Sequence, residues 1–223
     1  MYTAKPMPAQ IASDDLELLA QAETATIGHF RQIGFMDIAL RPLRPDQKVV
    51  GTAVTLALPS IDSSMLHHAL SETRRGDILV IDRLQDRRFA CLGGGVALAA
   101  VAAGVAGVII DGPCTDVSEI LEAGLPVWAR GVSPITTRMT QIGGALNIPI
   151  SCGGAVVLPG DAILADESGI VVLRPEEVAS TASEAIGRQE RGAGRQRQIR
   201  AGDVRIGDLS GASARIRAAM TDS

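Results

Sequence analysis

The stretch that most constrains the fold of this chain is residues 89–120. Three consecutive glycines at 93–95 open an alanine- and valine-rich segment, whose small side chains suit a tightly packed helix. Gly104 ends this helical pattern, and the apolar, β-branched run at 105–110 has the length and composition of a buried strand. The Asp-Gly-Pro sequence at 111–113 predicts a turn. The stretch therefore predicts a helix, a strand and then a tight loop.

A second helix is expected immediately after that loop. Thr115 is a suitable N-cap for it, and Asp116 falls in its first turn. Alternating strands and helices indicate an α/β fold around a parallel sheet. In such folds ligands bind at the carboxyl ends of strands, where helix N-termini and free backbone N–H groups converge. We therefore expect the functional site at the two loops that carry the glycines and Asp116.

The rest of the chain continues the α/β pattern. The sequence Asp-Glu-Ser-Gly at 166–169 predicts a hairpin between two strands, and a polar, basic segment follows the last predicted helix. We expect a single domain at residues 1–190 and a polar extension at residues 191–223, which packs on a neighbour or is partly mobile. Other elements are expected at 13–27 (helix), 50–58 (strand), 65–75 (helix), 78–82 (strand), 125–129 (strand), 147–150 (strand) and 175–190 (helix).

Composition argues against several classes of protein. The net charge of −4 offers no electrostatic basis for nucleic-acid binding. Three cysteines, an odd number without a CxxC pair, do not form a disulfide framework. No apolar stretch is both long enough and free of glycine breaks to span a bilayer, and the first residues lack the apolar core of a signal peptide. We therefore expect a soluble, cytoplasmic protein with no nucleic-acid or membrane partner.

The glycines at 93–95 admit three interpretations. A dinucleotide-binding turn needs a third glycine where this chain has Leu98, so that motif matches only in part. The glycines could simply form a tight turn between a strand and a helix. A loop that presents free N–H groups to a carboxylate or phosphate fits the local pattern best.

The other polar residues leave alternatives open. Asp116 could serve only to stabilise its helix dipole, and Asp111 could be a turn-forming residue. His67 and His68 are adjacent and point to different helix faces, so we interpret them as packing or surface residues rather than a metal pair. Cys114 lies beside Asp116, but no histidine is near it in sequence to act as the base for a thiol nucleophile.

Several blocks of sequence, taken in order, resemble a known family. They are GTAVTL, HHAL with RRGDILVID, GGGVALAAVAAGVAGVIIDGPCTDV, GLPVWARGVSP, CGGAVVLPGDAILADESGIVVL and PEEV, and they span about residues 24–190. The family is named after the regulator of ribonuclease activity A and includes 4-hydroxy-4-methyl-2-oxoglutarate aldolases. The resemblance implies a swivelling ββα fold of the phosphohistidine-domain type, to which we add a helical C-terminal extension. It also implies a homotrimer or a dimer of trimers, with sites between subunits.

The resemblance further implies a site for a small oxo-acid substrate. In the aldolases a 2-oxo acid binds at a divalent cation, Mg²⁺ or Mn²⁺, and the metal-ligating aspartate corresponds to Asp116. The arginine that clamps the substrate corresponds to Thr115, and an acidic residue of the glycine loop corresponds to Gly94. Glu190 of a neighbouring subunit is a candidate for a further carboxylate from the C-terminal helix. The backbone N–H groups that bind the substrate correspond to Gly93, Gly94, Gly95 and Val96.

Two of these positions depart from the aldolase pattern. Thr115 cannot make the bidentate, charged contact of an arginine, and Gly94 cannot hold a metal-bound water or accept a proton. Arg130 or Arg138 could take the place of the missing clamp. The leading hypothesis is a divalent-metal-dependent carbon–carbon lyase that uses Asp116 in retro-aldol cleavage or oxaloacetate-type decarboxylation of a 2-oxo acid. The alternatives are a non-catalytic regulator-like protein that contacts an enzyme of RNA turnover, and a family member with other carbon-skeleton chemistry.

Overall fold

A mixed sheet forms the centre of the computed structural model, which describes residues 1–221. Its four central strands are parallel: β3 (Val49–Ala57), β4 (Asp77–Asp82), β5 (Gly107–Cys114) and β6 (Val127–Val132). β3, β4 and β5 are buried along most of their length, as expected for strands covered on both faces, and β6 is buried over its first half. The sheet order is β1-β7-β3-β4-β5-β6-β2, and β10 pairs with both β3 and β11. The outer strands are β1 (Tyr2–Ala4), β2 (Arg41–Pro42), β7 (Gly144–Leu146), β10 (Ala162–Ala165) and β11 (Ile170–Leu173).

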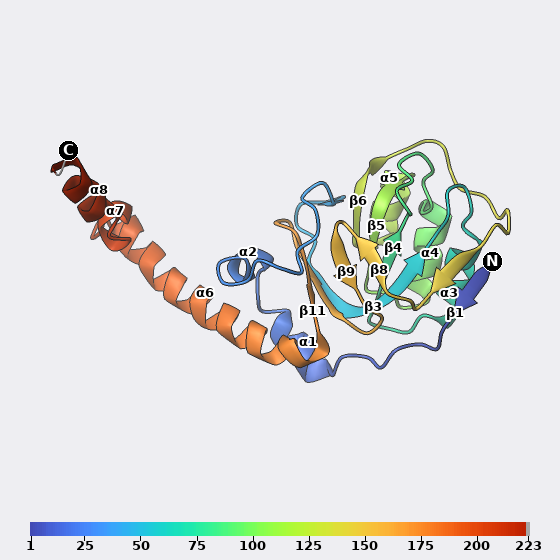
Figure 1. Cartoon of the computed structure of the whole chain (residues 1–223), viewed down its shortest axis with the longest axis horizontal. Coiled ribbons are helices and arrows are strands. Elements are labelled where there is room, and N and C mark those ends of the chain that lie inside the picture. Colours follow the sequence, from blue (N-terminus) through green and yellow to red (C-terminus); the bar gives the residue numbers. More distant parts are fainter. Residues whose placement is uncertain (222–223) are drawn as a thin grey trace.

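Alternation along the strands gives each face of the sheet its own core. On β4, Leu79 and Ile81 pack under helices, whereas Ile78 and Val80 point to the opposite face and pack under a hairpin. Figure 1 shows these two layers on either side of the central strands. The helices are α3 (Ser64–Glu72), α4 (Gly94–Ala102) and α5 (Val117–Ala123), and the hairpin is β8 (Ile150–Cys152) with β9 (Ala155–Val157).

The C-terminal helices lead away from the body of the protein (Figure 1). Helix α6 (Val178–Ala201) follows a 3₁₀ turn, η1 (Pro175–Glu177), and packs on α1 (Ser13–Leu19) and α2 (Thr24–Ile27) near its own start. None of its residues beyond Ala185 is buried. No helix in the described part of the chain is long and apolar enough to cross a membrane. The last described helices are α7 (Ile206–Leu209) and α8 (Ala212–Thr221).

Several predicted elements are confirmed. The helix after the triple glycine begins at Gly94, and the strand predicted at 50–58 is β3. The hairpin predicted at 166–169 joins β10 to β11, with Ala165 paired to Ile170. These elements depend on local apolar patterns and turn residues, which is why sequence alone locates them.

The single helix predicted at 13–27 is wrong, because the structure has two helices there. At the start of α2, the backbone N–H and hydroxyl of Thr24 both donate to the carboxylate of Asp166. Asp166 is buried in the β10–β11 turn, where it also accepts the N–H groups of Ser168 and Gly169. A contact between distant parts of the chain therefore interrupts a helix that the local pattern favours.

Two further predictions near the sheet are wrong. The residues predicted to form a turn at 111–113 belong to β5, whose pairing with β6 shifts register between Ile110 and Pro113. The strand predicted at 147–150 does not form: residues 147–149 lie between β7 and β8, and only Ile150 belongs to a strand, because Asn147 has a positive φ of 56° and breaks the extended run.

Helix α6, the last helix predicted from sequence, is longer than predicted. It was expected to end near residue 190, but α6 continues to Ala201, where Gly202 ends it with a left-handed φ of 78°. The domain boundary at residue 190 stays a prediction.

Candidate functional site

The glycine turn and the loop after β5 are held together by hydrogen bonds. Gly93 is the N-cap of α4. The N–H of Gly94 donates to Oδ2 of Asp116 at 3.2 Å, and the N–H of Thr115 donates to the carbonyl of Leu92 at 2.9 Å. The two loops that the sequence predicts for the site therefore lie side by side at the start of α4.

Asp116 has a left-handed backbone, with φ 51° and ψ 45°, a conformation that aspartate tolerates better than most residues. It is the N-cap of α5, so the prediction that Thr115 caps this helix is wrong. The Asp116 side chain makes no capping bond to α5 and accepts the Gly94 N–H instead. The carboxylate is thus directed to the neighbouring helix, which favours a role at the site over stabilisation of its own helix.

Gly93 and Gly94 are required here for space rather than for backbone freedom. A Cβ atom at Gly93 would lie 2.5 Å from Oδ2 of Asp116, and one at Gly94 would overlap the carboxylate of Glu119. The two carboxylates therefore occupy the places that side chains at 93 and 94 would fill. Glu119 stands where the missing acidic side chain of residue 94 would begin. Sequence reasoning missed it, although its position three residues after Asp116 puts both on one side of α5.

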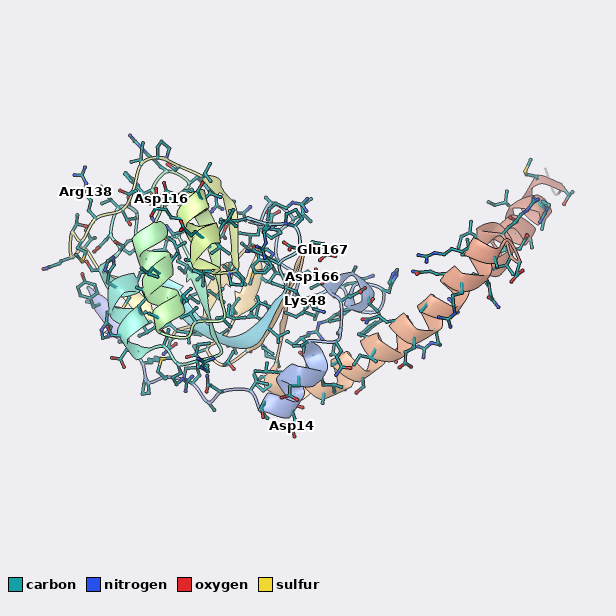
Figure 2. The ribbon with its side chains drawn as sticks, turned by 180° about the vertical axis from the view of Figure 1, so that it is seen from behind. Asp14, Lys48, Asp116, Arg138, Asp166 and Glu167 are labelled. Carbon is teal, nitrogen blue, oxygen red and sulfur yellow. The ribbon has the colours of Figure 1, made fainter. Side chains whose placement is uncertain are left out.

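A cavity of about 360 Å³ opens beside this turn. Asp116 is exposed at its edge, at the end of the molecule opposite the C-terminal helices (Figure 2). Of the predicted substrate-binding residues, Gly94 is buried and borders a separate hollow with Glu119, while the others line the cavity. The cavity lining comprises Ser63, His67, Leu70, Ala90, Cys91, Gly93, Gly95, Val96, Ala99, Thr115, Asp116, Thr136 and Thr137.

Asp62 anchors the loop that forms one wall of the cavity. This fully buried carboxylate accepts the N–H and hydroxyl of Ser64 and the N–H groups of Thr140, Ile142 and Gly143. Burial alone would raise the pKa of Asp62, but these hydrogen bonds outweigh it and hold the pKa well below the usual range. Asp62 therefore ties the start of α3 to the loop that carries the cavity threonines.

The structure separates the two arginines that could replace the clamp. Arg130 binds Asp111 through Nε and Asp37 at 2.7 Å through a terminal nitrogen, and it does not line the cavity. The expectation that it could serve as the clamp is therefore wrong, because two carboxylates hold its guanidinium group away from the cavity. Arg138 is exposed, and Figure 2 shows it at the same end of the molecule as Asp116. Its backbone pairs with residues 61 and 63 beside the cavity.

The cysteines and Glu190 do not contribute acid–base chemistry within one chain. Cys91 lines the cavity, but burial raises the pKa of its thiol to about 11, so the thiol stays protonated at neutral pH. Burial also raises the pKa of Cys114. Glu190 is exposed on α6 and does not line the cavity of its own chain. Its assignment to a neighbouring subunit's site stays a prediction.

His67 is exposed, which agrees with its interpretation from sequence as a packing or surface residue, and it also lines the cavity, which the sequence did not indicate. Ser63, His67 and Leu70 are spaced by four and three residues, which places them on one face of α3. His68 borders a different hollow with Tyr2. The spacing was visible in the sequence, but which face of α3 meets α4 was not.

Comparisons with known proteins identify the family of this chain. The family model described as RraA-like, Aldolase/RraA, matches residues 16–172. A protein of Halalkalibacterium halodurans, named as a candidate 4-hydroxy-4-methyl-2-oxoglutarate aldolase, is 31% identical over 81% of this chain and 91% of its own length.

Two solved structures are similar in fold. Streptomyces coelicolor RraAS2, described as an unusual member of the RNase ES inhibitor RraA family, has a TM-score of 0.74 and 24% identity, covering 86% of this chain and 98% of its own. The RNA-processing inhibitor RraA of Thermus thermophilus has a TM-score of 0.61 and 26% identity over 68% of this chain and 91% of its own. By the extent of the family match and the identity to its aldolase-named relative, the chain belongs to the RraA-like family.

Proposed function

We propose that this protein is a divalent-metal-dependent lyase that cleaves or decarboxylates a 2-oxo acid. The observation that carries the proposal is the pairing of the Asp116 carboxylate with the glycine turn of α4 at the edge of a 360 Å³ cavity. Backbone N–H groups in the first turn of a helix lack intrahelical partners, and Gly95 and Val96 of this turn line the cavity. They can therefore bind the carboxylate of an oxo acid.

Asp116 is the carboxylate that could hold a magnesium or manganese ion at the edge of the cavity. It is a hard oxygen donor, and such ions bind through one or two carboxylates together with waters and substrate oxygens. Glu119 borders a separate hollow with Gly94 and does not line the cavity. No larger group of His, Cys, Asp and Glu is suitably placed for a metal within residues 1–221. A bound divalent ion supplies Lewis-acid stabilisation of the negative charge that develops on the 2-oxo oxygen. We propose Glu190 of a neighbouring subunit as a further carboxylate.

The chain's own residues have separate roles in this proposal. Gly95 and Val96 orient the substrate carboxylate through their backbone N–H groups, and Asp116 would hold the divalent ion at the edge of the cavity. The side chain of Cys91 and the methylenes of the cavity wall exclude water from one side of the substrate. Thr115 offers only a hydroxyl, which already lies 3.3 Å from Asp116.

We also propose that the chain forms a homotrimer or a dimer of trimers, with the swivelling ββα fold, and acts in the cytoplasm. Helix α4 carries no charged side chain, and its Leu98 and Val101 are 63% and 39% exposed. Light scattering should therefore show a trimer or hexamer at micromolar concentration, and Leu98→Glu should shift it to a smaller, folded species. A wild-type monomer would contradict the assembly.

A non-catalytic, regulator-like protein that contacts an RNA-turnover enzyme is the second candidate. It is favoured by Thr115, which supplies no charge for a substrate carboxylate. One assay distinguishes the two candidate functions: the release of pyruvate from oxaloacetate and from 4-hydroxy-2-oxo diacids. The lyase should release pyruvate with Mg²⁺ and lose this activity after chelation. No release from the folded, assembled protein with Mg²⁺ or Mn²⁺ would favour the regulator.

A further inference from the structure

The cavity beside the glycine turn has an unequal distribution of charge. Asp116 contributes a carboxylate, and the remaining polar side chains of its lining are hydroxyls and a protonated thiol, apart from His67. Among the described residues that line the cavity, His67 is the one side chain able to carry a positive charge. An anionic substrate larger than a simple oxo acid therefore has one nitrogen-bearing side chain, that of His67, to donate to it in the cavity.

The position of His67 is fixed by the fold. Its backbone N–H donates to Ser63, and Asp62 holds the preceding turn through two bonds to Ser64. Ser63, His67 and Leu70 form the face of α3 that lines the cavity. The His67 ring has no hydrogen bond or ion pair to another described residue, so its N–H groups are available. A neutral imidazole donates one hydrogen bond and a protonated imidazole donates two.

We infer that His67 binds the distal carboxylate of a 2-oxo diacid and thereby selects diacids over mono-acids. The inference rests on the proposed lyase function. The first carboxylate and the 2-oxo group belong at the glycine turn beside Asp116, so the far end of the substrate extends across the cavity. Thr115 cannot supply a charged contact to it. Arg130 is committed to Asp111 and Asp37, and Arg138 does not line the cavity, which leaves His67 as the lining side chain that can carry a positive charge for this group.

His67→Ala should raise the KM for oxaloacetate by roughly 10- to 100-fold and change kcat by only a few-fold, because a charge-assisted hydrogen bond made in the ground state is lost. His68→Ala is the matched control, since this neighbour borders another hollow, and its KM should stay at the wild-type value. His67→Gln retains an N–H donor, so its KM should lie between that of His67→Ala and that of His68→Ala. Adding Thr115→Arg to His67→Ala should restore part of the affinity, because it supplies a cation from another residue of the cavity lining.

The substrate comparison separates recognition of the distal carboxylate from a structural effect. The KM for a 4-hydroxy-2-oxo mono-acid should be nearly equal in wild type and His67→Ala, while that for the matching diacid differs. The inference would be overturned if His67→Ala raised the KM for both acids equally. A large fall in kcat with an unchanged KM, or a diacid KM equal to that of wild type, would also overturn it.

Calorimetric binding of 2-oxoglutarate in the presence of Mg²⁺ separates this inference from the proposed function. Binding to wild type that weakens in His67→Ala but not in His68→Ala supports the inference, even if no turnover is found and the lyase proposal fails. Turnover by the wild type with equal diacid binding by both variants overturns the inference alone. A wild-type protein that neither binds nor turns over diacids overturns both.

Discussion

Asp116→Asn should abolish metal-coupled substrate binding and lower lyase turnover by about 10²–10³-fold, as expected when a charged group that stabilises the transition state is removed. Asparagine has nearly the same shape as aspartate and tolerates the left-handed backbone at φ 51°. Its amide oxygen can still accept the N–H of Gly94. The substitution therefore removes the negative charge while retaining the local structure.

The measurement is a calorimetric titration with Mn²⁺, with and without oxalate as an analogue of the enolate of pyruvate. Wild type should bind Mn²⁺ weakly alone and more tightly with oxalate, because the analogue supplies further oxygen ligands. Glu122→Gln, an exposed carboxylate on the same helix, is the control and should bind as wild type. Unchanged coupling in Asp116→Asn would place the metal elsewhere.

Asp62→Ala should lower the free energy of unfolding by about 3–5 kcal/mol, because it leaves the buried N–H of Gly143 and the part-buried donors of Ser64, Thr140 and Ile142 without their acceptor. Asp62 is fully buried and accepts hydrogen bonds from Ser64, Thr140, Ile142 and Gly143. The loop at 133–143 should lose its side-chain anchor at Asp62 and keep only the backbone bonds of Arg138 to residues 61 and 63, so the cavity wall should be weakened together with the stability. Urea unfolding followed by circular dichroism measures the change.

The same residue should make the protein sensitive to acid. The pKa of Asp62 is lowered in the folded state, so its contribution is fully present above the unfolded value of about 3.9 and is lost as pH falls below it. Asp62→Ala should therefore flatten the fall in stability below about pH 4. Asp46→Ala is the control, because Asp46 forms an exposed ion pair with Arg44. This substitution should lower the free energy of unfolding by less than about 0.5 kcal/mol. Equal stability of the two variants would show that Asp62 does not anchor the loop.

The sequence alone predicts much of the architecture and most of the cavity's glycine turn. The apolar run of β3, the hairpin after β10 and the start of α4 at Gly94 follow from local patterns of apolar and turn residues. Such patterns act over a few residues and do not depend on distant contacts. The predicted loops at Gly93 and Asp116 do meet, because consecutive parallel strands end at the same edge of the sheet.

Only the tertiary structure decided which side chains share the site. His67 lines the cavity because α3 turns one particular face to α4, and Glu119 fills the space at Gly94 because α5 packs against α4. Arg130 lies outside the site because it forms ion pairs with Asp111 and Asp37, which belong to other segments of the chain. Each outcome depends on contacts between residues far apart in the chain, whose relative positions are set by packing of the whole domain rather than by local sequence pattern.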